Sequence, residues 1–142
     1  MRNLVRRVAL GGAVGVVVAG VAAPAMADEG AARVSCGGKF SRVMELNRGS
    51  VHGARLSGRY AKWHKAPVDD GYYVAYGKAH AKRLSAHAVV CLVSEKGGRI
   101  GLRPASRAQL RATVGKRDTW RYFAVSFNRY GHVNKIVQQY HP

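Results

Sequence analysis

Residues 72–103 read YYVAYGKAHAKRLSAHAVVCLVSEKGGRIGLR, and the β signal of the chain is concentrated here. The first five, residues 72–76, are mostly aromatic or β-branched, and residues 88–93 form a near-continuous apolar run of strand length. The polar residues 77–87 between these runs fit either a helical turn or a polar loop. The sequence Glu95–Gly98 is typical of a hairpin turn, so a return strand is expected directly after it.

A helix signal follows this hairpin. Ser106 and Gln109 have the spacing of a capping box, in which each side chain accepts a hydrogen bond from the other residue's backbone N–H. Leu110 and Val114 lie four residues apart and therefore share one face of a helix. The sequence predicts a short helix over residues 106–114.

The two flanking parts of the chain have different patterns. Residues 119–127 alternate between two faces, and the turn NRYG at residues 128–131 leads into residues 133–140, so a C-terminal β-hairpin is expected. On the N-terminal side, residues 40–46 approximate helical spacing and predict a second short helix. Residues 50–65 fit either a strand with turns or an exposed loop.

The N-terminus has the pattern of a secretory signal peptide. Three arginines precede an uncharged run over residues 8–21, and Ala25 and Ala27 are small residues at the positions before a cleavage site. We expect residues 1–27 to be removed and residues 28–142 to form a secreted, extracellular domain, with no stable membrane insertion after cleavage. An uncleaved anchor is the alternative, although the run is barely long enough to span a membrane.

Export affects the interpretation of the cysteines. Cys36 and Cys91 are the only two in the chain, and an even number outside the cytosol favours a disulfide between them. Two buried reduced thiols are the alternative. Together, the elements predict one small, basic α+β domain with an antiparallel sheet of four to five strands, one or two short helices on one face, and one disulfide.

Positive charge is the strongest functional feature of the sequence. Lys and Arg number 24 against 7 Asp and Glu, which gives a net charge of +17. This potential attracts an acidic extracellular protein or an anionic polymer, and nucleic acid is a possible partner. The same charge also fits a surface that only keeps the protein soluble. The residues predicted to bind the partner are Arg103, Arg107, Arg111, Arg117, Arg121, Trp63 and Trp120.

Aromatic side chains are interleaved with the basic residues in the first half of the folded chain. Such rings can stack on bases, but packing as ordinary core and strand residues is the favoured interpretation. They are Tyr60, Trp63, Tyr72, Tyr73 and Tyr76.

Residues 102–137 combine a helix with a Ser106 N-cap and Gly115 at its end, the aromatic string Trp120-x-Tyr122-Phe123, and a Gly131-containing turn. This pattern resembles the superfamily that joins the small outer-membrane-assembly lipoproteins with the β-lactamase-inhibitory proteins. The chain departs from it in having Pro-Ala before the helix cap and Lys-Arg after the helix. The resemblance implies a helix-plus-sheet binding module, such as an inhibitor of an extracellular enzyme.

The sequence contains no standard catalytic motif, and we expect no cofactor and no metal site. The leading hypothesis is therefore a secreted, cationic, non-enzymatic binding module. The alternative is a secreted ribonuclease or toxin, which needs a base, an acid and a cation around one phosphate. Residues of the right type for this chemistry are His80, His132, Lys82 and Glu45.

Overall fold

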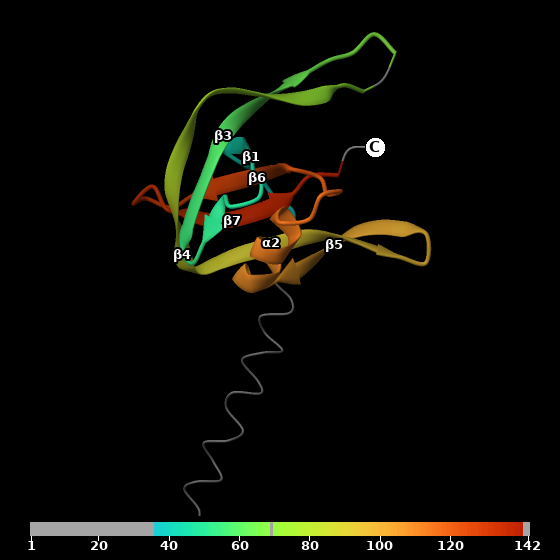
Figure 1. Ribbon diagram of the computed structural model, residues 1–142. Coiled ribbons are helices and arrows are strands. Elements are labelled where there is room, and N and C mark those ends of the chain that lie inside the picture. The colour runs from blue at the N-terminus through green and yellow to red at the C-terminus, as the bar shows by residue number, and fades with distance from the viewer. Residues whose placement is uncertain (1–35, 69, 141–142) are drawn as a thin grey trace, which may run out of the picture. The chain divides into compact units, whose positions relative to one another are not determined.

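The computed structural model describes residues 36–68 and 70–140 (Figure 1). The predicted signal peptide, residues 1–27, lies outside the described residues. Strands account for 58% of the structure and helix for 8%. The predicted α+β class is therefore wrong, because the described chain is mostly β, with one helix and a seven-stranded mixed sheet where four or five antiparallel strands were expected.

The strands of this sheet close into a ring. The sheet order is β2-β3-β1-β6-β7-β4-β5, and an additional pairing of β3 with β4 closes the five strands β3, β1, β6, β7 and β4. Strands β4 and β7 run parallel, and the other pairs are antiparallel. The elements are β1 Arg42–Glu45, β2 Val51–His52, β3 Arg55–His64, β4 Tyr72–Lys96, β5 Arg99–Ala105, α2 Arg107–Val114, β6 Tyr122–Phe127 and β7 Val133–Gln138.

Strand β4 is 25 residues long and takes part in two hairpins. Its first half pairs with β3 and its last part with β5, and the two hairpins extend from the ring in Figure 1. The expectation of a helical turn or loop over residues 77–87 is wrong. The reason is pairing: Lys82 lies opposite Leu56, and the backbone N–H of Leu84 donates to the Ala54 carbonyl at 2.6 Å. These long-range hydrogen bonds impose the strand on a stretch with little β propensity of its own.

The second expected helix, over residues 40–46, is also wrong, since this segment is β1. Strands β3 and β6 flank β1 on both edges, so that Met44 lies between Tyr60 and Phe123. Met44 and Leu46 are two residues apart and both fully buried, which fits the two-residue period of a strand and not that of a helix. Residues 50–65, left undecided by the sequence, form β2, a turn and β3.

The predicted helix and the two later hairpins are confirmed. In α2 the Ser106 hydroxyl accepts a hydrogen bond from the Gln109 N–H, and the Gln109 side chain accepts one from the Ser106 N–H. Leu110 and Val114 are buried in the core, to which β1, β2, β3, β4, β6 and β7 also contribute. Hairpins β4–β5 and β6–β7 form where expected. None of the helical structure in the described ranges is long and apolar enough to cross a membrane.

The predicted disulfide between Cys36 and Cys91 is confirmed, with Cα atoms 5.9 Å apart. It joins the start of the described chain to the completely buried part of β4. Gln138 is a buried polar residue of β7, and both ends of its side-chain amide form hydrogen bonds. Its Oε1 accepts from the Val93 N–H, and its Nε2 donates to Thr119 and to the Trp120 carbonyl. Both features fasten β4 to its neighbours.

Candidate anion-binding site

A groove of about 750 Å³ lies between α2 and the turn region around β2. Four cationic side chains line it and come from three places in the chain. Arg107 and Arg111 lie one turn apart on α2, Arg48 comes from the loop before β2, and Lys116 follows the helix. We call these four residues the cationic groove.

No carboxylate lines the cationic groove. Among the described residues the one salt bridge joins Arg59 to Glu45 at 3.3 Å, and it lies outside the groove. The side chains of Arg48, Arg107 and Arg111 make no hydrogen bond with another described residue. Their guanidinium donors therefore face solvent without a counter-charge, which is the arrangement that attracts phosphate, sulfate or carboxylate groups.

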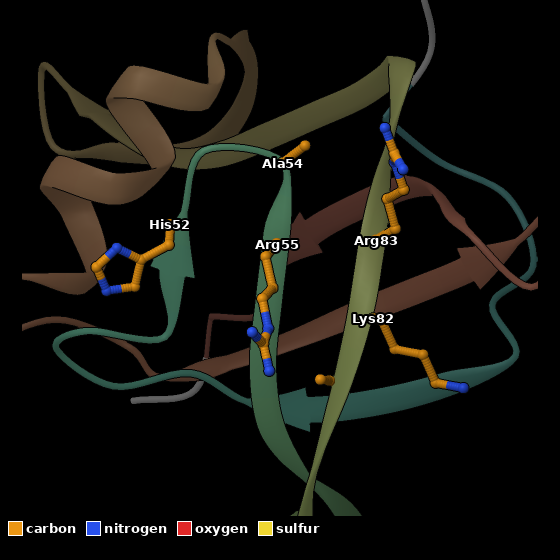
Figure 2. Close-up of a pocket in the computed structure, with 6 residues that line it drawn as sticks. His52, Ala54, Arg55, Lys82 and Arg83 are labelled. Atoms are coloured by element: carbon orange, nitrogen blue, oxygen red, sulfur yellow. The ribbon is translucent and has the colours of Figure 1, made fainter.

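A second basic hollow of about 410 Å³ adjoins the other side of the β2–β3 turn (Figure 2). Its side chains come from β2, β3 and β4 and include His52, Arg55, Lys82 and Arg83. Arg55 and Arg83 are direct cross-strand partners. Their side chains extend in opposite directions along the two strands (Figure 2).

The structure brings together two of the predicted binding residues, Arg107 and Arg111. Arg103 lies on β5, and Arg117 lies in the loop after α2. Arg121 is used inside the protein, because its guanidinium donates to the carbonyls of Val114, Lys116 and Arg117 and so caps the helix C-terminus. The two predicted tryptophans lie elsewhere: Trp63 is on β3, and Trp120 packs edge-to-face on Tyr140.

Sequence reasoning left Arg48 and Lys116 out of the site. Arg48 is far from the helix in sequence and approaches it only because β2 and its turn fold back against α2. Since the segment around β2 was undecided between strand and loop, nothing in the sequence indicated this approach. Lys116 directly follows the helix-ending Gly115, and its position in the last turn region was the one available signal.

The alternative catalytic residues are held in four separate local contacts. His80 stacks on Tyr60 with ring centroids 4.5 Å apart, and Glu45 pairs with Arg59. The Lys82 ammonium lies 5.4 Å from the centre of the Phe127 ring. His132 lies 6.2 Å from Tyr130, measured between ring centroids. No described hydrogen bond or ring contact joins any two of these four residues.

A third hollow, of about 420 Å³, is aromatic and lies on the sheet formed by β6, β1 and β3. Its floor consists of the small side chains of Ala124, Val43 and Ala61, which are successive cross-strand partners. Trp63 and Tyr73 line the part next to the β3–β4 hairpin and contact each other edge-to-face at 4.9 Å. We call this hollow the aromatic groove.

Two tyrosines beside the aromatic groove, Tyr73 and Tyr122, have a raised pKa and stay uncharged near neutral pH. Burial raises the pKa of the Tyr73 hydroxyl above its usual value. Burial and the negative charge of Glu45 raise the pKa of Tyr122, whose ring lies 5.4 Å from that of Tyr73. Two cations, Arg42 and Lys62, also line this groove, and both contact tyrosine rings, at 4.4 Å from the Tyr60 centroid and 4.7 Å from the Tyr76 centroid respectively.

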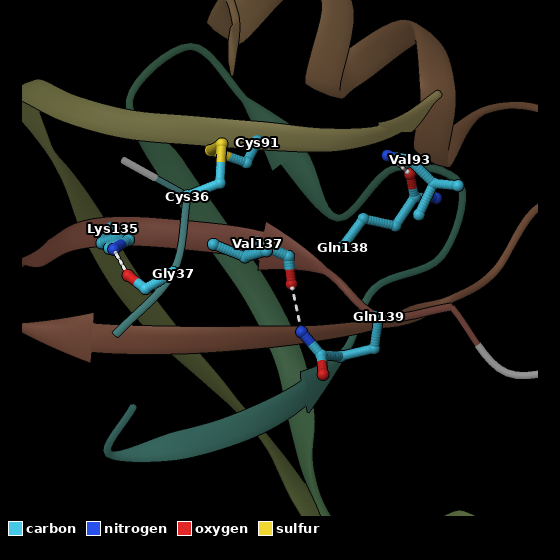
Figure 3. The surroundings of a disulfide bond; sticks show 8 residues. All are labelled: Cys36, Gly37, Cys91, Val93, Lys135, Val137, Gln138 and Gln139. Carbon is cyan, nitrogen blue, oxygen red and sulfur yellow. Dashed lines mark hydrogen bonds between the residues drawn. A yellow bond between two sulfur atoms is a disulfide. The ribbon is translucent and has the colours of Figure 1, made fainter. Parts of the chain in front are cut away.

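Three bonds fasten the N-terminal end of the described chain, and Figure 3 shows the disulfide and the hydrogen bond of Lys135 to Gly37. The disulfide fixes Cys36, the Lys135 ammonium donates to the Gly37 carbonyl, and Ser126 donates to the Lys39 carbonyl at 3.1 Å. These bonds position Phe40, the next residue, as part of the groove lining.

No protein-family model matches the chain, and no curated protein or solved structure is similar to it at a significant level. Within residues 36–68 and 70–140, no group of three or more His, Cys, Asp and Glu side chains is placed to hold a metal ion. The function of the sites is therefore inferred from their own residues.

Proposed function

We propose that this protein is a secreted, non-enzymatic binding module that holds an anionic polymer in the cationic groove. The observation that carries the proposal is the convergence of Arg48, Arg107, Arg111 and Lys116 on one hollow without a carboxylate in its lining. Cations that line one hollow repel one another, and an anion bound there offsets that repulsion.

The rest of the surface supports a polymer over a small anion. The second basic hollow with Arg55 and Arg83 adjoins the same turn, so that cationic side chains continue beyond the groove. A repeating anion can occupy both hollows at once and gains affinity from each contact. Guanidinium groups also suit phosphate and sulfate, because their planar donors bind two oxygens together.

The test compares two double variants that remove the same charge. Arg107→Ala with Arg111→Ala removes two cations from the groove, and Arg99→Ala with Arg103→Ala removes two from β5. Calorimetric titration with long-chain polyphosphate over a range of salt concentrations measures affinity and its salt dependence. We expect the groove variant to lose about tenfold in affinity and to lower the salt slope by about two, as for two lost phosphate contacts.

The control should lose less than half as much in free energy, since its arginines do not line the groove. Equal losses in the two variants would show that only net charge matters and would refute the groove as the site. If polyphosphate does not bind, and an acidic protein binds only when Arg107 and Arg111 are present, then the partner is a protein and not a polymer.

The secreted location has its own test. The disulfide is consistent with an oxidising compartment. Mass spectrometry of the protein recovered from culture medium should find a chain that begins at Asp28 and carries the closed disulfide. An intact N-terminus in the cell pellet would contradict export and cleavage.

A further inference from the structure

The aromatic groove is a slot of the right kind for a flat ring. Its floor is made of the short side chains of Ala124, Val43 and Ala61, of which Ala124 is buried and Val43 and Ala61 are partly exposed. Its volume of about 420 Å³ lies in the range of small-ligand pockets, which are mostly apolar with a few polar groups. Arg42 and Lys62 also line the hollow, where the Arg42 guanidinium donates to the Tyr76 hydroxyl at 3.2 Å and the Lys62 ammonium lies 4.7 Å from the centre of the Tyr76 ring.

Trp63 is the ring best placed to receive a ligand. It is 38% exposed although it also packs against Tyr73. Gly71, at φ 126°, makes this position possible, since a Cβ there would lie 2.7 Å from a carbon of the Trp63 ring. The hairpin end therefore holds the indole against its backbone and presents it in the groove.

A surface path connects the aromatic groove with the cationic groove. Arg48 lines both the cationic groove and a smaller hollow of about 360 Å³ that also contains Arg59. From there Arg59, Ala61 and Trp63 lie on one face of β3, because alternate residues of a strand share a face. Glu45, the acidic residue on this path, is neutralised by its salt bridge with Arg59.

Cations at one end of a path and an aromatic slot at the other match a polymer that carries both charge and flat rings. We infer that the anionic polymer is a single-stranded nucleic acid, with phosphates in the cationic groove and along Arg59, and a base on Trp63. This inference rests on the proposed function. Aromatic stacking accepts any base, so no sequence preference is required. In a duplex the bases are stacked and paired, and they cannot enter the slot.

The test measures fluorescence anisotropy of labelled oligothymidylate with the wild-type protein and three variants. Trp63→Ala removes the stacking ring, and Trp63→Phe keeps a smaller one. Tyr130→Ala is the matched control, because Tyr130 is 67% exposed on the β6–β7 turn and does not line the aromatic groove. Competition with duplex DNA, polyphosphate and polygalacturonate ranks the polymer classes.

We expect Trp63→Ala to weaken oligothymidylate binding about tenfold or more, as for the loss of one base–aromatic stack. Trp63→Phe should restore most of the affinity, and Tyr130→Ala should leave it unchanged. Affinity for polyphosphate should be the same in all four proteins, which separates loss of stacking from loss of fold.

Equal wild-type affinity for oligothymidylate, duplex and polyphosphate, with no effect of Trp63→Ala, would overturn this inference and leave the proposed function intact. A larger effect of Trp63→Ala on polygalacturonate than on oligothymidylate would identify an acidic glycan instead and would also overturn it. Failure of the wild-type protein to bind any of these polymers would refute the proposed function itself.

Discussion

Helix α2 and the middle of strand β4 are held in place by different kinds of contact. The helix is capped by its own residues at the start, through Ser106 and Gln109, and by the nearby Arg121 at its end. The middle of β4 is held by β3 on one edge and at Leu84 by β7, both distant in sequence. The difference teaches that α2 forms through contacts with residues near it in sequence, whereas the middle of β4 becomes a strand only when the whole ring closes.

The largest test of this difference removes the disulfide that joins β4 to the start of the described chain. Replacing Cys36 and Cys91 by Ala releases a closed loop with a sequence separation of 55, for which the chain-entropy model gives on the order of 4 kcal/mol. We expect urea unfolding to show a loss of about that size in the free energy of unfolding. Reduction of the wild-type protein should reproduce it, and a loss below about 1 kcal/mol would show that the ring holds β4 without the bridge.

A second substitution acts within the middle of β4. Leu84 is 1% exposed and belongs to the core, so Leu84→Ala leaves a cavity and should cost about 3 kcal/mol. Ile100→Ala on β5 is the control, because Ile100 is 40% exposed and surface substitutions change stability by less than about 0.5 kcal/mol. Equal costs for the two variants in thermal unfolding would contradict a core role for this part of β4.

The same difference explains which parts of the fold the sequence predicted. The helix and the hairpin turns could be predicted from residues that are close together in sequence. The disulfide could be predicted because the chain has two cysteines. Residues 77–87 and 40–46 were assigned wrongly because their own propensities are weak and strand pairing overrides them. Ring closure needs β4 to pair with β3 and with β7, and no local pattern contains that information.

The candidate site divides in the same way. Arg107 and Arg111 were predictable, since their spacing on a confirmed helix places them on one face. Arg48 was not, because it joins them only when the turn region around β2 packs on α2. Trp63 was identified as a binding residue, but the groove in front of it arises from small residues on β1, β3 and β6 that carry no signal of their own.

The close approach of β3 to β1 gives a third, smaller test of ring closure. A Cβ at Gly58 would collide with the Glu45 carbonyl oxygen and would lie 2.9 Å from a Leu46 methyl group. Gly58→Ala should therefore cost about 2 kcal/mol, as expected for overpacking. Gly101→Ala meets no atom within 4 Å and should be neutral or slightly stabilising. Chemical denaturation of the pair checks this, and a neutral Gly58→Ala would show that β1 and β3 can separate without loss.

The smallest expected effect concerns helix α2. It tests whether α2 is stabilised locally and independently of β4. Ser106→Ala removes the hydroxyl that accepts from the Gln109 N–H at 3.1 Å, and loss of an N-cap costs about 1 kcal/mol. Because α2 is stabilised locally, native-state hydrogen exchange should speed up mainly in its first turn, while amides of β4 change only as much as global stability does. Ser106→Asn, which supplies another capping oxygen, should restore protection. If Ser106→Ala instead exposes β4 amides to the same degree as Leu84→Ala does, then α2 is part of the closure of the ring and is not an independent local element.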